Sequence, residues 1–214
     1  MKKLIVTLFF VGIGLIGFAQ EKDNKGDIET LFGGQRLKVT GGFGGVDWKA
    51  TRLNGRTTWM VGGKAALTFN EKVNIGLAGY GLNKKSPFQG TDPAQELWMS
   101  FNYAGLYAEY IMNPNKLFHI SFPLIIGSSH VNVRDQLENY PPNHPDNDFD
   151  PHVIEDSNGF VIEPGVNVEL NVLKFMKVGA SGGYRFVGNH DLKNVSNGDL
   201  NNWSFSVGVK FGWF

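Results

Sequence analysis

One segment of the sequence matches the local signature of a serine hydrolase. Residues 179–183 (GASGG) have the G-x-S-x-G spacing of a nucleophile elbow, with Ser181 as the nucleophile. That elbow places its serine on a sharp turn between a strand and a helix. Here the five residues lie inside a longer segment of alternating apolar and small residues, and no helical pattern follows. We therefore interpret Ser181 as a small residue on one face of a strand.

A second segment has the residue types of a calcium site. Asp146, Asp148 and Asp150 have the alternate spacing that opens an EF-hand loop. The sixth position of that loop must be Gly and the twelfth Glu, but they are Pro151 and Ser157 here, which excludes an EF-hand. A looser surface Ca²⁺ site on the three aspartates remains a hypothesis, beside the simpler interpretation of a solvated acidic loop. No other cofactor is indicated.

Glu109, His119 and Ser121 form a third candidate. His119 and Ser121 share one face of a predicted strand, and a turn at 113–115 would place Glu109 across from His119. A serine hydrolase needs this set of nucleophile, base and carboxylate. The same side chains would also form a buried polar network if their face is the inside of a barrel. We favour the network, because a lipid substrate would not reach that face.

The elements that position these residues are predicted to be strands. In the segment 203–213, apolar and aromatic residues alternate with small or polar ones, which is a two-residue period. The apolar positions are Trp203, Phe205, Val207, Val209, Phe211 and Trp213. An apolar face with aromatic residues at both ends is typical of lipid-facing strands in membrane barrels.

Seven further segments show the same period, so the sequence predicts an all-β fold, an eight-stranded antiparallel up-and-down transmembrane β-barrel. They begin at Leu37 and otherwise span 57–69, 73–82, 98–112, 118–126, 160–172 and 176–186. In the first, Leu37, Val39, Gly41 and Phe43 are predicted to share the apolar face. In the fourth, the alternation is blurred, and we expect a β-bulge to shift its phase.

Connection lengths support the same architecture. The connections 70–72, 113–115 and 173–175 are short, whereas most of the others are long. Short periplasmic turns and long external loops are expected of such a barrel, and Asn54-Gly55 is a hairpin turn signal. Loops are predicted around 83–97, over 134–158 and over 188–202. The loop 134–158 is the longest and is strongly acidic.

The N-terminus has the pattern of a secretory signal peptide. A basic start is followed by an apolar run and small residues, so residues 1–19 are expected to be removed after Ala19. Residues 20–36 are polar and are predicted to be a periplasmic tail, and 37–214 the barrel. Cysteine is absent, which excludes disulfides and thiol chemistry. The 20 basic and 20 acidic residues give no basic patch for nucleic acid.

The face opposite the apolar one is predicted to be the lumen. It is rich in Gly and Ser, which suit the narrow interior of eight strands, and its charges have both signs, as buried pairs require. The predicted polar network of the lumen comprises Lys64, Glu109, His119, Glu163, Glu169, Lys177, Arg185 and Lys210. Folding about Lys174 would set Glu163 opposite Arg185. A soluble lipocalin-like barrel is the alternative that alternation alone leaves open.

The signal peptide, the eight strands, the short turns and the terminal segment 207–214 (VGVKFGWF) resemble the outer-membrane β-barrel family common in Bacteroidetes. The resemblance implies a pore-like or structural barrel in a Gram-negative outer membrane, inserted by the barrel-assembly machinery. In that family the terminal Phe shares the apolar phase. Here Trp213 holds that phase and Phe214 falls outside it.

The function expected from the sequence is a non-catalytic one: structure, adhesion or porin-like passage of small solutes. A barrel enzyme acting on lipid, similar to the lipid A deacylases, is the alternative, and a soluble carrier is the third. Outer-membrane lipid and lipopolysaccharide are the expected partners. Because the loop 134–158 carries seven acids and one Arg, calcium bound at Asp146, Asp148 and Asp150 would be needed to bridge it to lipopolysaccharide phosphates.

Overall fold

The computed structural model describes residues 37–83, 86–89, 96–134, 153–193 and 195–214, and residues 37–214 form one compact unit. Its wall consists of eight long strands, and a short strand β4 and a short helix α2 lie in the connections. The elements are β1 (Val39–Leu53), β2 (Arg56–Phe69), β3 (Val73–Leu82), β4 (Ser86–Gln89), β5 (Glu96–Met112), β6 (Phe118–Arg134), β7 (Val153–Leu173), β8 (Met176–Gly188), α2 (Asn197–Leu200) and β9 (Asn202–Trp213).

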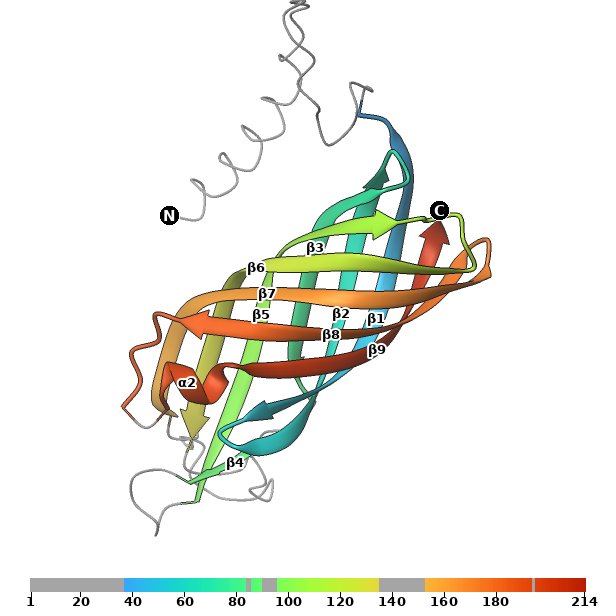
Figure 1. Cartoon of the computed structure of the whole chain (residues 1–214). Coiled ribbons are helices and arrows are strands. Elements are labelled where there is room, and N and C mark those ends of the chain that lie inside the picture. The colour runs from blue at the N-terminus through green and yellow to red at the C-terminus, as the bar shows by residue number, and fades with distance from the viewer. Residues whose placement is uncertain (1–36, 84–85, 90–95, 135–152, 194) are drawn as a thin grey trace, which may run out of the picture. The chain divides into compact units, whose positions relative to one another are not determined.

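The strands close into an antiparallel up-and-down barrel, which confirms the predicted architecture (Figure 1). Consecutive strands of the wall pair with each other, so that β3 pairs directly with β5, and β1 pairs with β9. Strand β4 pairs only with β5, beyond the end of β3. The predicted loop 83–97 therefore contains one more strand than expected.

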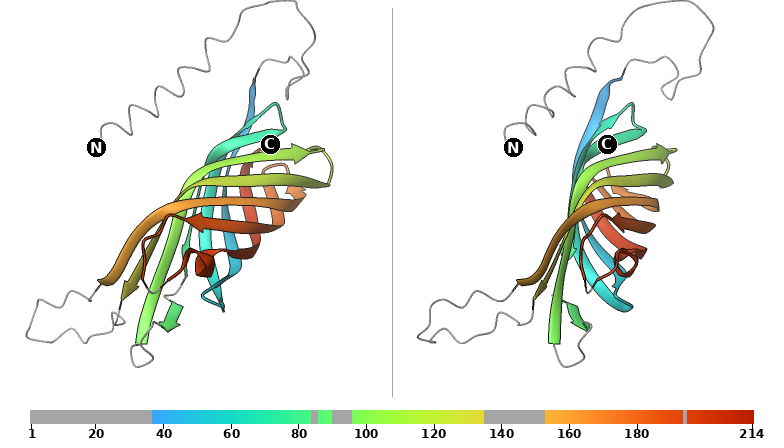
Figure 2. Two further views of the ribbon diagram at one scale, coloured as in Figure 1. Left: turned by 60° about the vertical axis from the view of Figure 1, so that its left-hand side comes forward. Right: turned by 90° about the vertical axis from the view of Figure 1, so that its left-hand side faces the viewer.

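The two ends of the barrel differ in their connections. At the turn end lie the short connections 70–72, 113–117 and 174–175. At the loop end lie the connections after β3, β6 and β8, together with the β1–β2 turn. In that turn Asn54 and Gly55 both have positive φ angles, of 48° and 71°, as the predicted hairpin turn requires. Strands β5, β6 and β7 project beyond the other strands at the loop end (Figure 2).

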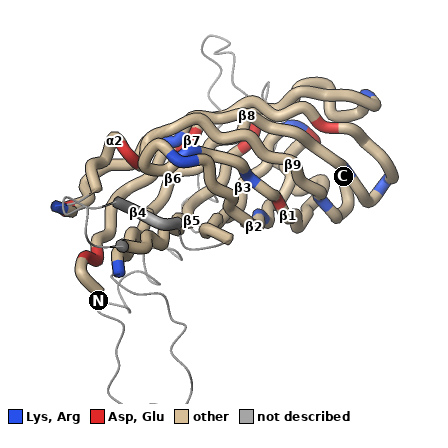
Figure 3. Tube along the Cα trace, turned by 90° about the horizontal axis from the view of Figure 1, so that it is seen from below, with Lys and Arg blue, Asp and Glu red and all other residues tan. Residues whose placement is uncertain are grey.

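Side chains alternate between the outside and the lumen along the wall strands. In β9, Trp203, Phe205, Val207, Phe211 and Trp213 are exposed, whereas Ser204 and Lys210 are buried. Charged residues are few along the wall strands and more frequent near their ends (Figure 3). The barrel is therefore apolar outside and polar over much of its interior, as the sequence predicts.

Two predicted phases were wrong. Phe43 is buried inside the barrel, because the register between β1 and β2 shifts between Val39 and Gly41. In β5 no bulge occurs, since its pairing with β6 is continuous from Trp98 to Met112. The odd-numbered residues of β5 point inward throughout. Its first half looked out of phase because its inward residues at the loop end, including Phe101, are themselves apolar.

The boundaries of the longest predicted loop also change. Strand β7 begins at Val153 and pairs with β6 up to Arg134, so residues 153–158 belong to the wall. Residues 135–152 lie outside the described part of the chain. In the predicted loop 188–202 the structure forms α2, which starts with a capping box between Ser196 and Asp199. Among the described residues, no helix is long and apolar enough to cross a membrane.

A close approach between β5 and β6 yields a test of the fold. Gly105 pairs with Gly127, and a methyl group at Gly127 would overlap the backbone of Ala104 and Gly105. We expect Gly127→Ala to lower the free energy of unfolding by about 1–3 kcal/mol, the usual effect of overpacking. Urea unfolding of the protein in detergent micelles, followed by Trp fluorescence, measures this change. The matched control is Gly44→Ala in β1, where no atom lies within 4 Å of the added carbon. Equal losses in both variants would contradict the packing.

Candidate functional site in the barrel lumen

The polar network of the lumen is densest near the turn end, around Lys210 of β9. Its ammonium group donates to Glu109 Oε2 at 2.9 Å and also contacts a carboxylate oxygen of Glu169. Glu109 comes from β5 and Glu169 from β7, so one cation joins three strands across the interior. Ser121 donates to Glu109 at 2.6 Å, and Nδ2 of Asn167 donates to Glu169 at 2.7 Å. All five side chains are buried.

Two further ion pairs occupy the middle of the lumen. Lys49 of β1 contacts Glu163 of β7 at 2.6 Å, and Ser204 donates to the same carboxylate at 2.8 Å. Lys64 contacts Asp47 at 3.0 Å. Two tyrosines complete these pairs: Tyr80 donates to Asp47 at 2.8 Å, and Tyr103 donates to Glu163. Each carboxylate therefore has both an ammonium partner and a hydroxyl donor.

Arg185 does not pair with Glu163, contrary to the prediction. The predicted register of β7 and β8 is confirmed, since Ile162 pairs with Phe186 and Asn171 with Lys177. However, Lys49 reaches Glu163 from the opposite side of the lumen. The Arg185 guanidinium instead donates to the Leu200 carbonyl, from Nε at 3.1 Å and from Nη2 at 3.0 Å. It also lies over the Phe101 ring, 4.9 Å from its centroid.

The serine and the histidine of the hydrolase hypothesis contact two different carboxylates. The β5–β6 register places Glu109 opposite Pro123, so it is not across from His119 as predicted. Ser121 donates to Glu109, whereas His119 Nε2 lies 3.0 Å from Glu169 Oε2. No hydrogen bond joins Ser121 to His119 in the described part of the chain. The other hydrolase candidate, Ser181, lies in the middle of β8, with its hydroxyl 2.6 Å from that of Ser206.

Several members of the network were not predicted from the sequence. Asp47 and Lys49 face the lumen, but the phase of β1 was predicted only from residues 37–43, and the register shift between Val39 and Gly41 was not recognised. The alternation of Val46 and Trp48 with these two charges was the available signal. Tyr103 was missed because an aromatic residue resembles a lipid-facing one when only its type is considered.

An apolar layer fills the lumen at the loop end. Its buried side chains come from six wall strands and from the segment that contains α2: Leu53, Met60, Leu97, Met99, Phe101, Val131, Val133, Val161, Val187, Val195 and Leu200. Arg185, with 0% of its surface exposed, lies directly against this layer through Phe101 and Met60. We call the eleven apolar residues of this layer, listed above without Arg185, the apolar seal.

His190 connects the segment between β8 and β9 to the wall at the loop end. Its Nε2 lies 2.8 Å from the Ser129 hydroxyl, and its ring packs against Gly159. Burial lowers the pKa of His190 below its usual range, and the nearby His130 lowers it further. The neutral imidazole is therefore the form that this contact favours.

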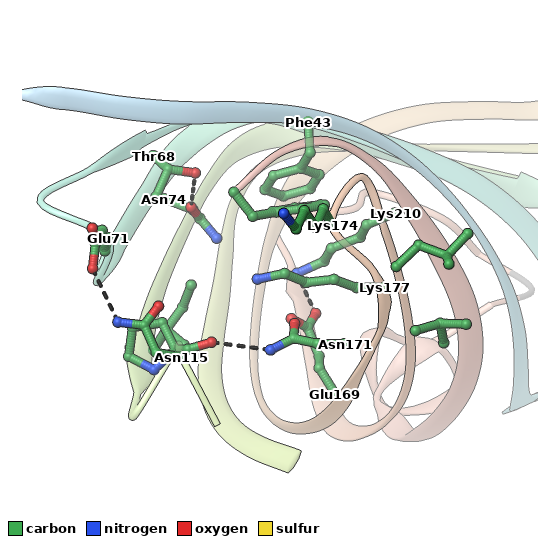
Figure 4. A pocket seen from close by; sticks show the side chains of 15 residues that line it. Phe43, Thr68, Glu71, Asn74, Asn115, Glu169, Asn171, Lys174, Lys177 and Lys210 are labelled. Atoms are coloured by element: carbon green, nitrogen blue, oxygen red, sulfur yellow. Dashed lines mark hydrogen bonds and ion pairs between the residues drawn. The ribbon is translucent and has the colours of Figure 1, made fainter. Parts of the chain in front are cut away.

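A cavity of about 590 Å³ opens at the turn end (Figure 4). Lys177 and Lys210 lie side by side on its wall, Asn171 extends from the end of β7, and Asn115 lies in the β5–β6 turn. Phe43 and Phe214 supply an aromatic surface, with their ring centroids 6.1 Å apart. The cavity combines cationic, amide and aromatic groups.

The calcium hypothesis cannot be followed further in space, because Asp146, Asp148 and Asp150 lie outside the described residues. Within the described residues, no group of three His, Asp or Glu side chains is arranged to hold a metal ion. The calcium site therefore stays a prediction.

The closed wall and the polar lumen define the class of the fold, a small eight-stranded up-and-down barrel. No family model and no curated protein matches the sequence. The chain is similar to the crystal structure of Neisserial surface protein A (NspA), with a TM-score of 0.52 and 12% identity, over 83% of this chain and 99% of that one. This similarity supports the fold.

Two further solved structures are similar at lower scores. A major outer membrane protein from Thermus thermophilus has a TM-score of 0.48 and 12% identity, over 80% of this chain and 99% of that one. Ail, the attachment invasion locus protein of Yersinia pestis, has a TM-score of 0.47 and 11% identity, over 81% and 98%. At these identities a likeness concerns the fold and carries no function.

The Lys49–Glu163 pair yields a test of the network. We expect Glu163→Ala to lower the free energy of unfolding by roughly 3–5 kcal/mol, because it leaves the Lys49 ammonium buried without its carboxylate. Replacing both partners, as Lys49→Met with Glu163→Leu, should cost clearly less, because no buried charge is stranded. Urea unfolding in micelles compares the three proteins. A single variant as stable as the wild type would show that this pair is solvated.

His190 yields a pH dependence at the loop end. Because its folded pKa is lowered, the unfolded chain binds a proton that the folded chain excludes once the pH falls below about 6.5. The stabilising contribution of His190 is thus fully present above that pH and is lost progressively below it. Urea midpoints measured across this range should fall more steeply for the wild type than for His190→Gln. Identical pH profiles would contradict the contribution of His190.

Proposed function

We propose that this chain is an integral outer-membrane barrel with a non-catalytic role in structure or adhesion. The observation that carries the proposal is the inverted polarity of the barrel. Its outside is apolar along the wall strands, and its inside holds the ion pairs of Lys49, Lys64 and Lys210. A soluble lipocalin-like barrel would show the opposite arrangement, an apolar cavity and a solvated exterior. The polarity therefore argues against a soluble carrier.

Exposed aromatic side chains lie toward both ends of the barrel, as expected of the two interfaces of a membrane. In β9, Trp203 near the loop end is 61% exposed and Trp213 near the turn end is 62% exposed, with exposed Val207 between them. Neighbouring strands add Phe160 and Phe186 toward the loop end. Residues on this surface would contact lipid.

The apolar seal favours structure or adhesion over passage of small solutes. Its side chains are at most 4% exposed and occupy the lumen at the loop end. In the middle of the lumen the described cavities measure only about 30 Å³ and 10 Å³. A solute entering at the turn end would meet these layers before reaching the other side.

The geometry of the network also favours a non-catalytic role over the lipid A deacylase-like alternative. Ser121 donates a hydrogen bond to Glu109, and His119 contacts Glu169. The serine therefore has a carboxylate partner in place of an imidazole base. All four side chains are buried inside the barrel. A lipid acyl chain would have to enter the lumen to reach them.

The remaining parts of the proposal follow from the sequence. Residues 1–19 would direct export and be removed, and the terminal strand β9 would be read by the barrel-assembly machinery. In this orientation the turn end would face the periplasm and the loop end the exterior, where it would meet lipopolysaccharide. We also propose that the chain belongs to the outer-membrane β-barrel family that is common in Bacteroidetes.

Fractionation and conductance together test this function. The protein should remain with outer membranes after carbonate washing, and its gel mobility should change on boiling, as for a closed barrel. Reconstituted in planar lipid bilayers, the wild type should give no steady conductance. The variant Met60→Ala, Phe101→Ala and Tyr103→Ala, which thins the apolar seal and opens the packed middle of the lumen, should conduct. Met60 and Phe101 are both completely buried in that layer.

Three outcomes would contradict the proposal. Recovery of the protein as a soluble periplasmic species would exclude membrane integration. A stable conductance of the wild type, equal to that of the thinned variant, would instead favour solute passage. Loss of acyl chains from lipid A that depends on Ser121 would support the enzyme alternative.

A further inference from the structure

Lys177 is an uncompensated cation at the turn-end cavity. Its side chain is 5% exposed, and the Phe214 ring, 4.1 Å from Nζ, is its partner. The other lumen cations of the described chain have oxygen partners: Lys49 bonds to Glu163, Lys64 to Asp47, Lys210 to Glu109 and Glu169, and Arg185 to the Leu200 carbonyl. Among the described lumen cations, Lys177 alone lacks a carboxylate, hydroxyl or carbonyl within bonding distance.

The position of Lys177 increases this imbalance. It lies directly opposite Lys210 in the β8–β9 register, and like charges placed opposite each other repel. Glu169, the nearest compensating carboxylate in the network, already contacts both Lys210 and His119. A buried ammonium is costly without a counter-charge. An anion bound in the cavity would therefore interact favourably with the Lys177 ammonium, which no carboxylate of the described residues contacts.

Asn171 adds an acceptor beside this cation. It is the direct cross-strand partner of Lys177, so the two side chains share the lumen face. Its Nδ2 donates to the carbonyls of Pro114 and Lys116, at 3.1 Å and 2.8 Å, which fixes the orientation of the amide. Its Oδ1 is buried and has no hydrogen-bond partner. A ligand for this place would therefore combine an anion with a neighbouring N–H donor.

The remaining walls suit an apolar substituent. Phe43, Phe214 and Leu173 line the same cavity, which at about 590 Å³ is large enough for a small organic molecule. Lys174, exposed in the β7–β8 turn, lines the same cavity and adds a third positive charge to those of Lys177 and Lys210 (Figure 4).

We propose that the turn-end cavity binds an N-acylated α-amino carboxylate, the chemistry of a peptide C-terminus. The carboxylate contacts the Lys177 ammonium, the amide N–H donates to Asn171 Oδ1, and the side chain packs against Phe43 and Phe214. Because Asn171 and Lys177 are direct cross-strand partners, a ligand that carries a carboxylate beside an amide N–H could contact both. That this cavity faces the periplasm rests on the proposed membrane orientation, whereas the binding chemistry does not.

Calorimetry on the full chain refolded in micelles tests the site, with N-acetyl-alanine as the probe. N-acetyl-alanine amide lacks the carboxylate and propionate lacks the N–H, so each should bind roughly tenfold more weakly or worse. Lys177→Met should abolish binding of N-acetyl-alanine. Asn171→Leu should reduce its affinity to that of propionate and leave propionate binding unchanged. Lys193→Met, in the β8–β9 connection at the other end, is the matched control and should bind normally.

The variants also separate loss of binding from loss of folding. Lys177→Met removes the repulsion with Lys210, so it should keep the gel shift on boiling and unfold at equal or higher urea concentration than the wild type. N-acetyl-alanine should raise the urea midpoint of the wild type and leave that of Lys177→Met unchanged. A longer probe, acetyl-trialanine, distinguishes the sources: tighter binding than N-acetyl-alanine identifies a peptide terminus, and equal binding identifies a small metabolite.

Three results would overturn the proposal. These are equal binding of N-acetyl-alanine by the wild type and Lys177→Met, absence of binding to the folded wild type, and binding of inorganic phosphate as tightly as N-acetyl-alanine. The last result would mean an unspecific anion site. None of these results bears on membrane integration or conductance, so the site and the proposed function fail separately.

Discussion

The closed wall of the barrel imposes the constraint on which the rest of the structure depends: a charge that points inward must find its partner inside the barrel. Lys210 satisfies it by joining Glu109 of β5 to Glu169 of β7. Lys49 satisfies it by reaching Glu163 from β1. These contacts connect strands that are not neighbours in the wall, so they fix the interior independently of the backbone ladders.

Much of the fold could be predicted because a two-residue period reports directly which face of a strand is apolar. The outward positions of β9 and the short turn 70–72 follow from local sequence alone. The predictions that were wrong also have physical reasons. A register shift after Val39 turned Phe43 inward, and only the later alternation of Val46 and Trp48 with two charges indicates that shift in the sequence. The extra strand β4 depends on β5 extending beyond β3, which is a property of the assembled barrel.

The lumen network was predictable in membership and much less in pairing. Residue type and phase suffice to identify inward charges such as Glu109 and Lys210. The partner of Glu163, however, was sought within its own hairpin, where the register is readable from the turn. The actual partner, Lys49, is 114 residues away in sequence and lies across the interior. Contacts across a lumen depend on barrel closure and side-chain length, which a two-residue period does not contain.

The apolar seal explains why β5 was the hardest strand to interpret. Near the loop end its inward residues Leu97, Met99 and Phe101 are apolar and fill the lumen, whereas its outward residues there include Ser100 and Asn102. Farther along, the same inward face carries Tyr103, Tyr107 and Glu109. The interior thus changes along the axis from apolar at the loop end, through neutralised pairs, to an excess cation at the turn end. Water and solutes meet closed packing at the loop end and an open, charged cavity at the turn end. The two ends of the lumen therefore differ in chemistry, although the outer face of the wall is apolar along its length. A structure of this kind presents its binding chemistry at one end, and the other end provides closure.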